Sequence, residues 1–201
     1  VLSRVPIQIG YDNRYFNDTY QAMPKKGYTK MFEDILNHPN IEVKLNTHFK
    51  DISNPNDFKK IIYTGPIDEY FDFRHGELPY RSIRFDFLTH DNEYLQKVGT
   101  MNFPGFEFQH TRMTEFKHLT FQKNAKTTIC SEYPEAYNSK KNLPYYPIPT
   151  PANKNLFNRY KADAIKIKDR IAFVGRLANY QYFNMDQAAA RGLQFFQHEI
   201  C

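Results

Sequence analysis

The sequence predicts a mixed α/β fold in which an antiparallel-rich sheet layer is flanked by helices. Between residues 80 and 133, apolar and polar side chains alternate over several short segments, which is the two-residue period of half-buried strands. On either side of this region, apolar residues recur every three or four positions, as they do in amphipathic helices. The 201 residues are 41% hydrophobic and 24% charged, which excludes a disordered chain, a coiled coil and a collagen-like repeat.

The first third of the chain predicts one helix and two strands. The helix opens at residues 27–29, ends at the stop signal His38-Pro39-Asn40, and has one apolar face made of Met31, Phe32, Ile35 and Leu36. Alternation at Ile41, Val43 and Leu45 predicts a half-buried strand. Residues 60–63 form a short apolar run closed by Thr64-Gly65-Pro66, which predicts a buried strand.

The middle of the chain predicts the sheet. Residues 80–88 alternate, so that Ile83, Phe85 and Phe87 share a face that we expect to point into the core. Further strands are predicted over 94–102, 108–116 and 127–133, and together they suggest a four-stranded antiparallel meander. Within it, Arg112 and Glu115 form either a surface ion pair or part of a ligand site.

The last third predicts a helix over 155–164, a buried strand over 170–175 and a closing helix over 186–198. The N-terminus of the closing helix offers free N–H donors to an anionic oxygen, and Arg176 beside it is suited to a phosphate. The alternative is an ordinary strand–loop–helix with an Asn or Asp N-cap. Upstream, the prolines of residues 143–149 hold Tyr145 and Tyr146 in an extended loop, either for a diphosphate or for packing on a strand.

Composition narrows the class of partner. The net charge is +5 and the isoelectric point about 9.0, but Lys and Arg are scattered, so we expect no nucleic-acid partner. The chain has 18 Phe, 15 Tyr and no Trp, and tyrosine suits both a core and a polar ligand pocket. Its only cysteines, Cys130 and Cys201, form neither a disulfide scaffold nor a C-x-x-C pair, which favours a reducing, cytoplasmic location.

Several kinds of site are not expected. The seven histidines show no metal-ligand spacing, no G-x-S-x-G motif occurs, and no apolar run is long enough to span a membrane. The start of the chain has no signal-peptide pattern and no Met, so we expect a processed or truncated product. No two of the eight glycines have the spacing of G-x-G-x-x-G, so the phosphate loop for any dinucleotide would lie outside this chain.

An ordered series of short motifs runs through almost the whole chain. It comprises Arg4-Val5-Pro6 with Tyr15-Phe16, Met23 to Tyr28, Tyr63 to Asp68, Leu78 to Ser82, Met101-Asn102-Phe103, Thr111 to Glu115, Glu132-Tyr133, Pro144 to Ile148, and Gly175-Arg176-Leu177. Together these motifs resemble UDP-galactopyranose mutases, flavoenzymes that interconvert UDP-galactopyranose and UDP-galactofuranose. The resemblance implies galactofuranose biosynthesis for cell-wall polysaccharide.

The resemblance also implies an architecture and a mechanism. Residues 1–201 would be the C-terminal region of a flavoprotein of the FAD-linked reductase/oxidase type: the sheet domain plus the last strand–loop–helix of the FAD-binding domain. The FAD-binding Rossmann motif would precede Val1. The implied isomerase reaction passes through an adduct between the sugar and N5 of the reduced flavin. We expect this chain alone to be inactive, and a homodimer is a further expectation.

The resemblance assigns roles to individual residues. Arg4 and Arg112 match the two arginines that clamp the substrate diphosphate, which makes physical sense because a guanidinium binds phosphate oxygens bidentately. The residues that match other substrate contacts are Tyr15, Tyr145 or Tyr146, and Tyr182 for the phosphates, and Asn102 and Glu132 for the sugar side. Gly175, Arg176, Tyr182 and Met185 match the flavin-contacting turn. Asn184 also lies at the substrate site, where the family often has Asp.

Two other functions compete with this interpretation. One is a non-catalytic basic–aromatic module that binds glycans or single-stranded nucleic acid by stacking, which the core-facing assignment of Phe85 and Phe87 disfavours. The other is a flavoprotein related to amine oxidases, which would share the last strand–loop–helix turn but would not combine Arg4, Arg112 and the Tyr145-Tyr146 pair.

Overall fold

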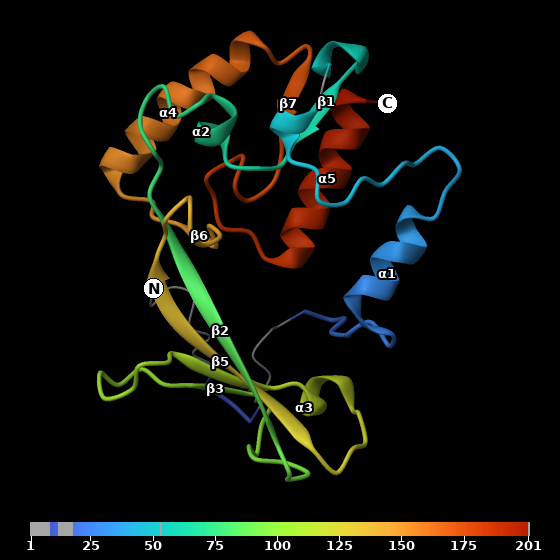
Figure 1. Cartoon of the computed structure of the whole chain (residues 1–201), viewed down its shortest axis with the longest axis vertical. Helices are drawn as coiled ribbons and strands as arrows, with labels where there is room; N and C mark the ends of the chain where they lie inside the picture. The colour runs from blue at the N-terminus through green and yellow to red at the C-terminus, as the bar shows by residue number, and fades with distance from the viewer. Residues whose placement is uncertain (1–8, 12–17, 53, 201) are drawn as a thin grey trace.

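The computed structural model describes residues 9–11, 18–52 and 54–200, and it confirms the predicted fold class (Figure 1). Two long strands, β2 (Tyr80–His90) and β5 (Thr127–Ala136), connect a helical part at one end of the molecule with a sheet at the other. The helical part holds α2 (Ile67–Tyr70), α4 (Pro151–Lys166) and α5 (Met185–Glu199) around the short strands β1 (Ile61–Tyr63) and β7 (Ile171–Phe173).

The larger sheet has five antiparallel strands in the order β3-β4-β5-β2-β6. Its shorter members are β3 (Thr100–Asn102), β4 (Arg112–Glu115) and β6 (Tyr146–Pro147). The strands predicted over 94–102 and 108–116 are thus present only as the much shorter β3 and β4. The predicted meander is wrong, because β2 pairs with β5, the last of the four strands, and not with β3. This pairing brings residues that are far apart in sequence onto one face of the sheet.

Contrary to the prediction, the aromatic residues of β2 do not face the core. Phe85 is 37% exposed and Phe87 is 63% exposed, although they lie on one face as their alternation requires. The pattern therefore identified the face correctly but not its surroundings. The reason is physical: a two-residue period reports that a face is apolar, and whether another layer covers that face depends on the rest of the fold.

The core lies in the helical part, where β1 and β7 pair in parallel. Its buried side chains come from segments up to 113 positions apart and are Ile67, Phe71, Leu78, Tyr80, Tyr160 and Tyr180. The helix that supplies Tyr160 begins at Pro151 rather than near 155, because the Thr150 side chain caps it by accepting a bond from the Asn153 N–H at 3.2 Å. Near its end, Asp163 accepts bonds from Lys166 at 2.7 Å and His75 at 2.8 Å.

The first helix is confirmed as α1 (Gly27–Leu36), but its apolar face is open. Phe32 is 53% exposed and Ile35 is 60% exposed, and Figure 1 shows α1 apart from the helical part. The predicted strand over 41–45 is wrong: the segment is irregular and exposed, since no strand in the described part of the chain pairs with it.

Three short helices complete the described part of the chain. The single-turn helices η2 (Phe49–Asp51) and η3 (Pro55–Asp57) follow this segment, and α3 (Lys117–Thr120) lies at the far end of the sheet. No helix among the described residues is long and apolar enough to cross a membrane.

Candidate functional site

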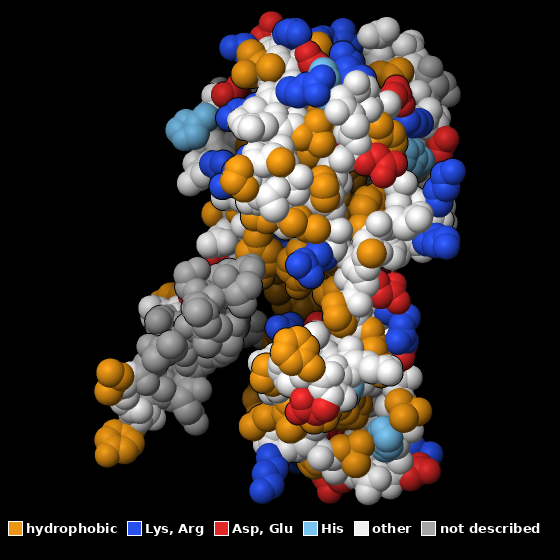
Figure 2. Space-filling view, turned by 90° about the vertical axis from the view of Figure 1, so that its left-hand side faces the viewer, with side chains coloured by type: hydrophobic (Ala, Val, Ile, Leu, Met, Phe, Trp, Pro, Cys, Tyr) orange, Lys and Arg blue, Asp and Glu red, His pale blue; other side chains and the backbone are white. Residues whose placement is uncertain are grey.

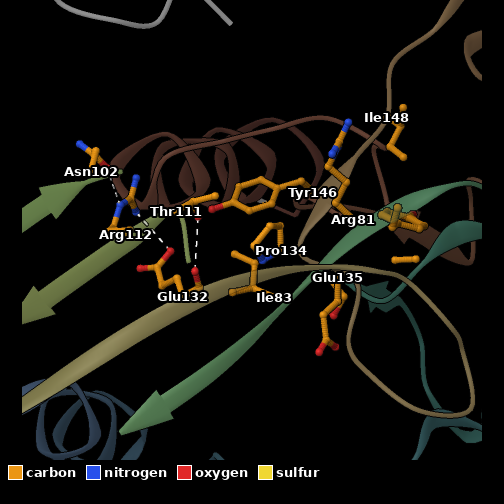
Figure 3. A pocket seen from close by; sticks show the side chains of 13 residues that line it. Arg81, Ile83, Asn102, Thr111, Arg112, Glu132, Pro134, Glu135, Tyr146 and Ile148 are labelled. Atoms are coloured by element: carbon orange, nitrogen blue, oxygen red, sulfur yellow. Dashed lines mark hydrogen bonds and ion pairs between the residues drawn. The ribbon is translucent and has the colours of Figure 1, made fainter. Parts of the chain in front are cut away.

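A cleft of about 660 Å³ lies where the sheet meets the strand β6. Ligand pockets for small molecules commonly have about 300–1,000 Å³. Seen from the side, the molecule is hollowed between its helical part and its sheet, and hydrophobic side chains gather there with a basic one (Figure 2). Side chains from all five strands of the larger sheet line the cleft (Figure 3).

Arg112 is held in the cleft wall by partners on both neighbouring strands. Its Nε donates to Asn102 Oδ1 at 3.2 Å, and its Nη1 lies 3.6 Å from Glu132 Oε2. These contacts follow from the register, in which Arg112 stands opposite Asn102 on β3 and opposite Glu132 on β5. Since the Arg112 side chain remains 43% exposed, its guanidinium is oriented by the protein and still accessible to a ligand. The alternative of a surface ion pair between Arg112 and Glu115 is wrong, because the Glu115 side chain is buried and its carboxylate accepts bonds from Gln96 and Thr127.

Of the two candidate tyrosines, Tyr146 lines the cleft. Its ring lies between Arg112 and Arg81, with the hydroxyl on the side of Arg112 (Figure 3). Tyr145 packs instead on Phe85, with ring centroids 5.6 Å apart. Adjacent residues of an extended segment point in opposite directions, which explains the difference. Burial raises the pKa of Tyr146, and Tyr182 adds to this effect, so the hydroxyl stays neutral and can donate a hydrogen bond.

The last loop contributes Tyr182 and Arg176 to the same region. The rings of Tyr146 and Tyr182 stack at 5.7 Å, and the Arg176 guanidinium lies 4.6 Å from the Tyr182 ring centre. Arg176 also donates to the backbone carbonyls of Tyr145, at 3.4 Å, and Phe183. The guanidinium expected to pair with a phosphate is thus engaged by the protein, where it holds the two tyrosines in place.

The strand–loop–helix turn after β7 is present as expected. Gly175 lies two residues after β7 and has a φ of +106°, a conformation that favours glycine, and α5 begins at Met185 with Asn184 as its N-cap. The Asn184 N–H donates to Gln187 Oε1 at 2.9 Å. The first N–H groups of an α-helix have no partner within the helix, so this end of α5 can donate to an electron-rich ligand. Met185 beside it is 69% exposed.

The sequence-predicted residues fall into three groups, of which the first, at the turn after β7 and outside the cleft lining, comprises Gly175, Arg176, Asn184 and Met185, with Tyr145 packed on Phe85. Asn102, Arg112, Glu132 and Tyr146 line the cleft together, and Tyr182 joins them through its stacking on Tyr146. Arg4 and Tyr15 lie outside the described residues. The cleft also has lining residues that were not predicted, namely Arg81, Ile83, Thr111 and Pro134. Arg81 belongs to a family-like motif, and only the β2–β5 register shows that it shares a face with Glu132.

Comparisons with known proteins agree with the motifs. The family model described as UDP-galactopyranose mutase matches residues 1–182. A probable UDP-galactopyranose mutase of Klebsiella pneumoniae is 35% identical over 195 residues, which are 96% of this chain and 50% of that protein. A UDP-galactopyranose mutase of Mycoplasma genitalium is 36% identical, over 94% of this chain and 50% of that protein. A dTDP-fucopyranose mutase of Escherichia coli is 31% identical, over 98% of this chain and 53% of that protein.

A solved structure supports the fold independently. The crystal structure of a reduced UDP-galactopyranose mutase superposes with a TM-score of 0.57 at 15% identity, over 70% of this chain and 41% of that one. The chain spans about half the length of the curated relatives it matches. Since the family model covers most of the chain and the sequence motifs occur along its length, the chain belongs to the UDP-galactopyranose mutase family.

Proposed function

We propose that the cleft binds the diphosphate of UDP-galactopyranose or UDP-galactofuranose, and that the complete protein interconverts these two sugars as an isomerase. The observation that supports this proposal is the accessible Arg112 guanidinium, oriented by Asn102 and Glu132 and facing the Tyr146 hydroxyl. A planar guanidinium and a neutral hydroxyl are suited to the oxygens of a diphosphate, because both donate hydrogen bonds and one also supplies charge.

In this proposal each group has a distinct task. Arg112, with Arg4 from the N-terminal segment, neutralises the diphosphate as it leaves the anomeric carbon, and Tyr15, Tyr146 and Tyr182 donate hydroxyls to its oxygens. Asn102 and Glu132 line the sugar side and also keep Arg112 in place. Tyr145, which packs on Phe85, supports the loop and does not contact the ligand.

The turn from Gly175 to Met185 fits one part of a flavin. The amide groups at the start of α5 are suited to the electron-rich edge of a reduced isoalloxazine, and the exposed Met185 side chain to its ring. When bound, a reduced flavin supplies through N5 the nucleophile that displaces the diphosphate from the sugar. Gly175, Arg176, Tyr182 and Met185 would form this side of the site, and Asn184, the N-cap of α5, would contact the substrate. The sequence lacks the glycine spacing that would hold the FAD pyrophosphate.

We further propose that this chain is inactive alone. In this proposal it consists of the sheet domain and the last strand–loop–helix of the FAD-binding domain. The groups that bind the FAD pyrophosphate belong to the other half of the mutase. The two-stranded parallel pair β1–β7 and the open apolar face of α1 support this division, since parallel sheets are usually covered on both faces. Cytoplasmic location, a homodimer and a role in cell-wall polysaccharide stay predictions.

Calorimetric titration of the chain with UDP tests the diphosphate site. The Arg112→Ala variant should weaken UDP binding by about tenfold or more, because hydrogen bonds to charged groups contribute about 1.5–3 kcal/mol. Arg84→Ala is a matched control: Arg84 is 46% exposed and pairs with Glu135 at 3.3 Å, but it lies on the opposite face of β2. Equal losses in both variants, or no UDP binding by the unmodified chain, would contradict the proposal.

Three further measurements address the finer assignments and the alternative function. Turnover of UDP-galactopyranose with dithionite-reduced FAD should be undetectable for this chain, and product formation would overturn the proposed inactivity. Because one relative is a dTDP-fucopyranose mutase, titration with dTDP beside UDP shows which nucleotide the cleft prefers. A salt-dependent gel shift with random oligonucleotides would support the alternative of a nucleic-acid-binding module. The prediction that Phe85 and Phe87 face the core argued against that alternative, and their exposure in the structure weakens this argument.

A further inference from the structure

Glu115 is a buried carboxylate at the far end of the sheet, and the diphosphate site leaves it without a role. It is 0% exposed, and it accepts a hydrogen bond from Gln96 N–H at 2.7 Å and another from the Thr127 hydroxyl at 2.6 Å. The Leu95 N–H lies 3.1 Å from the same carboxylate. Burying a carboxylate is costly unless hydrogen bonds compensate, so the surrounding loop is built to hold this group.

A buried cation two positions later holds the same region. The Lys117 side chain is 5% exposed and lies 4.6 Å from the centre of the Tyr94 ring. Its ammonium group donates to three backbone carbonyls, those of Glu93 at 2.6 Å, Asn124 at 2.5 Å and Lys126 at 3.3 Å. His118 Nε2 lies 2.9 Å from the Gln96 carbonyl. We refer to Glu115, Lys117 and His118 as the distal anchor.

The distal anchor fixes the segment that leads directly into β3. Most of its hydrogen bonds are made with residues 93–96, whose N–H groups donate to Glu115 and whose carbonyls bind Lys117 and His118. The Glu115 N–H donates to the Gly99 carbonyl at 2.8 Å. β3 itself has only three residues, lies at the edge of the sheet and is exposed throughout. Such a short edge strand is marginal by itself, and it carries Asn102, whose side chain accepts the Arg112 Nε–H.

We propose that the distal anchor positions Arg112 for the diphosphate by holding β3, and with it Asn102, in register beside β4. Glu115, Lys117 and His118 are therefore positioning residues that act through Asn102 and never touch the ligand. The inference rests on the proposed diphosphate site. Without the anchor, β3 frays and Asn102 no longer orients the guanidinium. The ligand must then order, on binding, an arginine that Glu132 alone holds.

A double-mutant cycle on UDP affinity separates positioning from a merely structural role. Glu115→Gln keeps the size of the side chain but places an amide NH₂ where N–H and O–H groups now donate. It should weaken UDP binding by about three- to tenfold, which is the effect of losing one pre-ordered side chain. In an Asn102→Ala background the same change should have almost no further effect, because residues that act through one another are not additive.

Glu93→Gln is the matched control. Glu93 is exposed and lies in the same loop, and only its backbone carbonyl, which the substitution leaves in place, takes part in the anchor. Its UDP affinity should stay within about twofold of that of the unmodified chain, as expected for a surface substitution. If Glu115→Gln lowers only the melting temperature, or weakens UDP binding equally in both backgrounds, the positioning role is overturned.

Two measurements protect the test against failure of the variant or of the ligand site. Thr127→Val removes a single bond to Glu115 and should produce the same pattern more weakly if Glu115→Gln does not fold. Hydrogen exchange of the Phe103 amide, which donates to Thr111 at 2.9 Å, reports on β3 without any ligand. Faster exchange in the variants with no UDP binding by the unmodified chain would refute the diphosphate site alone, whereas unchanged exchange would refute the anchor.

Discussion

The Tyr180 hydroxyl fastens the strand that carries Tyr146, so its removal tests how the cleft is held together. The side chain is 5% exposed, and its hydroxyl lies 2.5 Å from the Pro79 carbonyl, its best acceptor. The same hydroxyl accepts the Ile148 N–H at 3.2 Å. Pro79 directly precedes β2 and Ile148 directly follows β6, so one oxygen joins the ends of two paired strands. Tyr180→Phe removes this oxygen alone.

The magnitude follows from what remains after the substitution. The Ile148 N–H also lies 3.2 Å from the Pro79 carbonyl, so neither group is left without a partner. The ring keeps its contacts with Tyr80 at 5.2 Å and Phe157 at 5.8 Å, so no cavity forms. The loss is therefore one neutral hydrogen bond, about 0.5–1.5 kcal/mol of unfolding free energy. For a chain of this size that lowers the melting temperature by about 1–6 °C.

Thermal unfolding followed by circular dichroism measures this shift, with Tyr137→Phe as the control. Tyr137 makes the same kind of ring contact with Tyr80, at 5.5 Å, but its hydroxyl has no hydrogen bond in the described part of the chain. Its substitution should change the unfolding free energy by less than about 0.5 kcal/mol. The reasoning fails if Tyr180→Phe melts together with Tyr137→Phe, since the hydroxyl would then contribute nothing.

Three further predictions test the site and the fold. Tyr146→Phe should weaken UDP binding by about three- to tenfold, whereas Tyr145→Phe should leave it within about twofold, because only the first hydroxyl faces the cleft; equal titration curves would contradict this. The hydrogen bonds from Lys166 and His75 lower the pKa of Asp163 from 3.8 to about 2. Since the unfolded chain then binds more protons between these values, stability should fall as the pH drops from 3.8 to about 2, and urea titrations should show a smaller fall for Asp163→Asn. Gly65→Ala should destabilise the fold by about 1–3 kcal/mol, because the new methyl would lie 2.6 Å from the hydroxyl of Tyr63; an unchanged melting temperature would argue against this clash.

Local patterns predicted most elements well. The helix over 27–36 and the closing helix are present because their apolar spacing and their start or stop residues act within a few positions. Strand lengths were predicted less well: the segments 94–102 and 108–116 keep only three and four residues in strands. Alternation continues into segments such as 93–96, where buried side chains hold the backbone in place of a partner strand.

In the functional site, too, the sequence identified individual residues, and the structure decided how they meet. Motif resemblance singled out Arg112, Asn102 and Glu132 individually, and the register explains why they meet. It left Tyr145 and Tyr146 unresolved, because only the position of β6 beside β2 determines which ring enters the cleft. The role of Arg176 was also not predictable, since its partners include backbone carbonyls, which have no sequence signature.

The sequence by itself determined the mixed α/β class, the identity and order of the motifs, and therefore the family. Those properties depend on residue type and on spacing along the chain. Only the tertiary structure decided that Phe87 is exposed, that Glu115 is buried, and that Arg112 pairs with Glu132. Burial and pairing depend on which distant segments meet, and that is the outcome of the whole chain's packing and not of any local pattern.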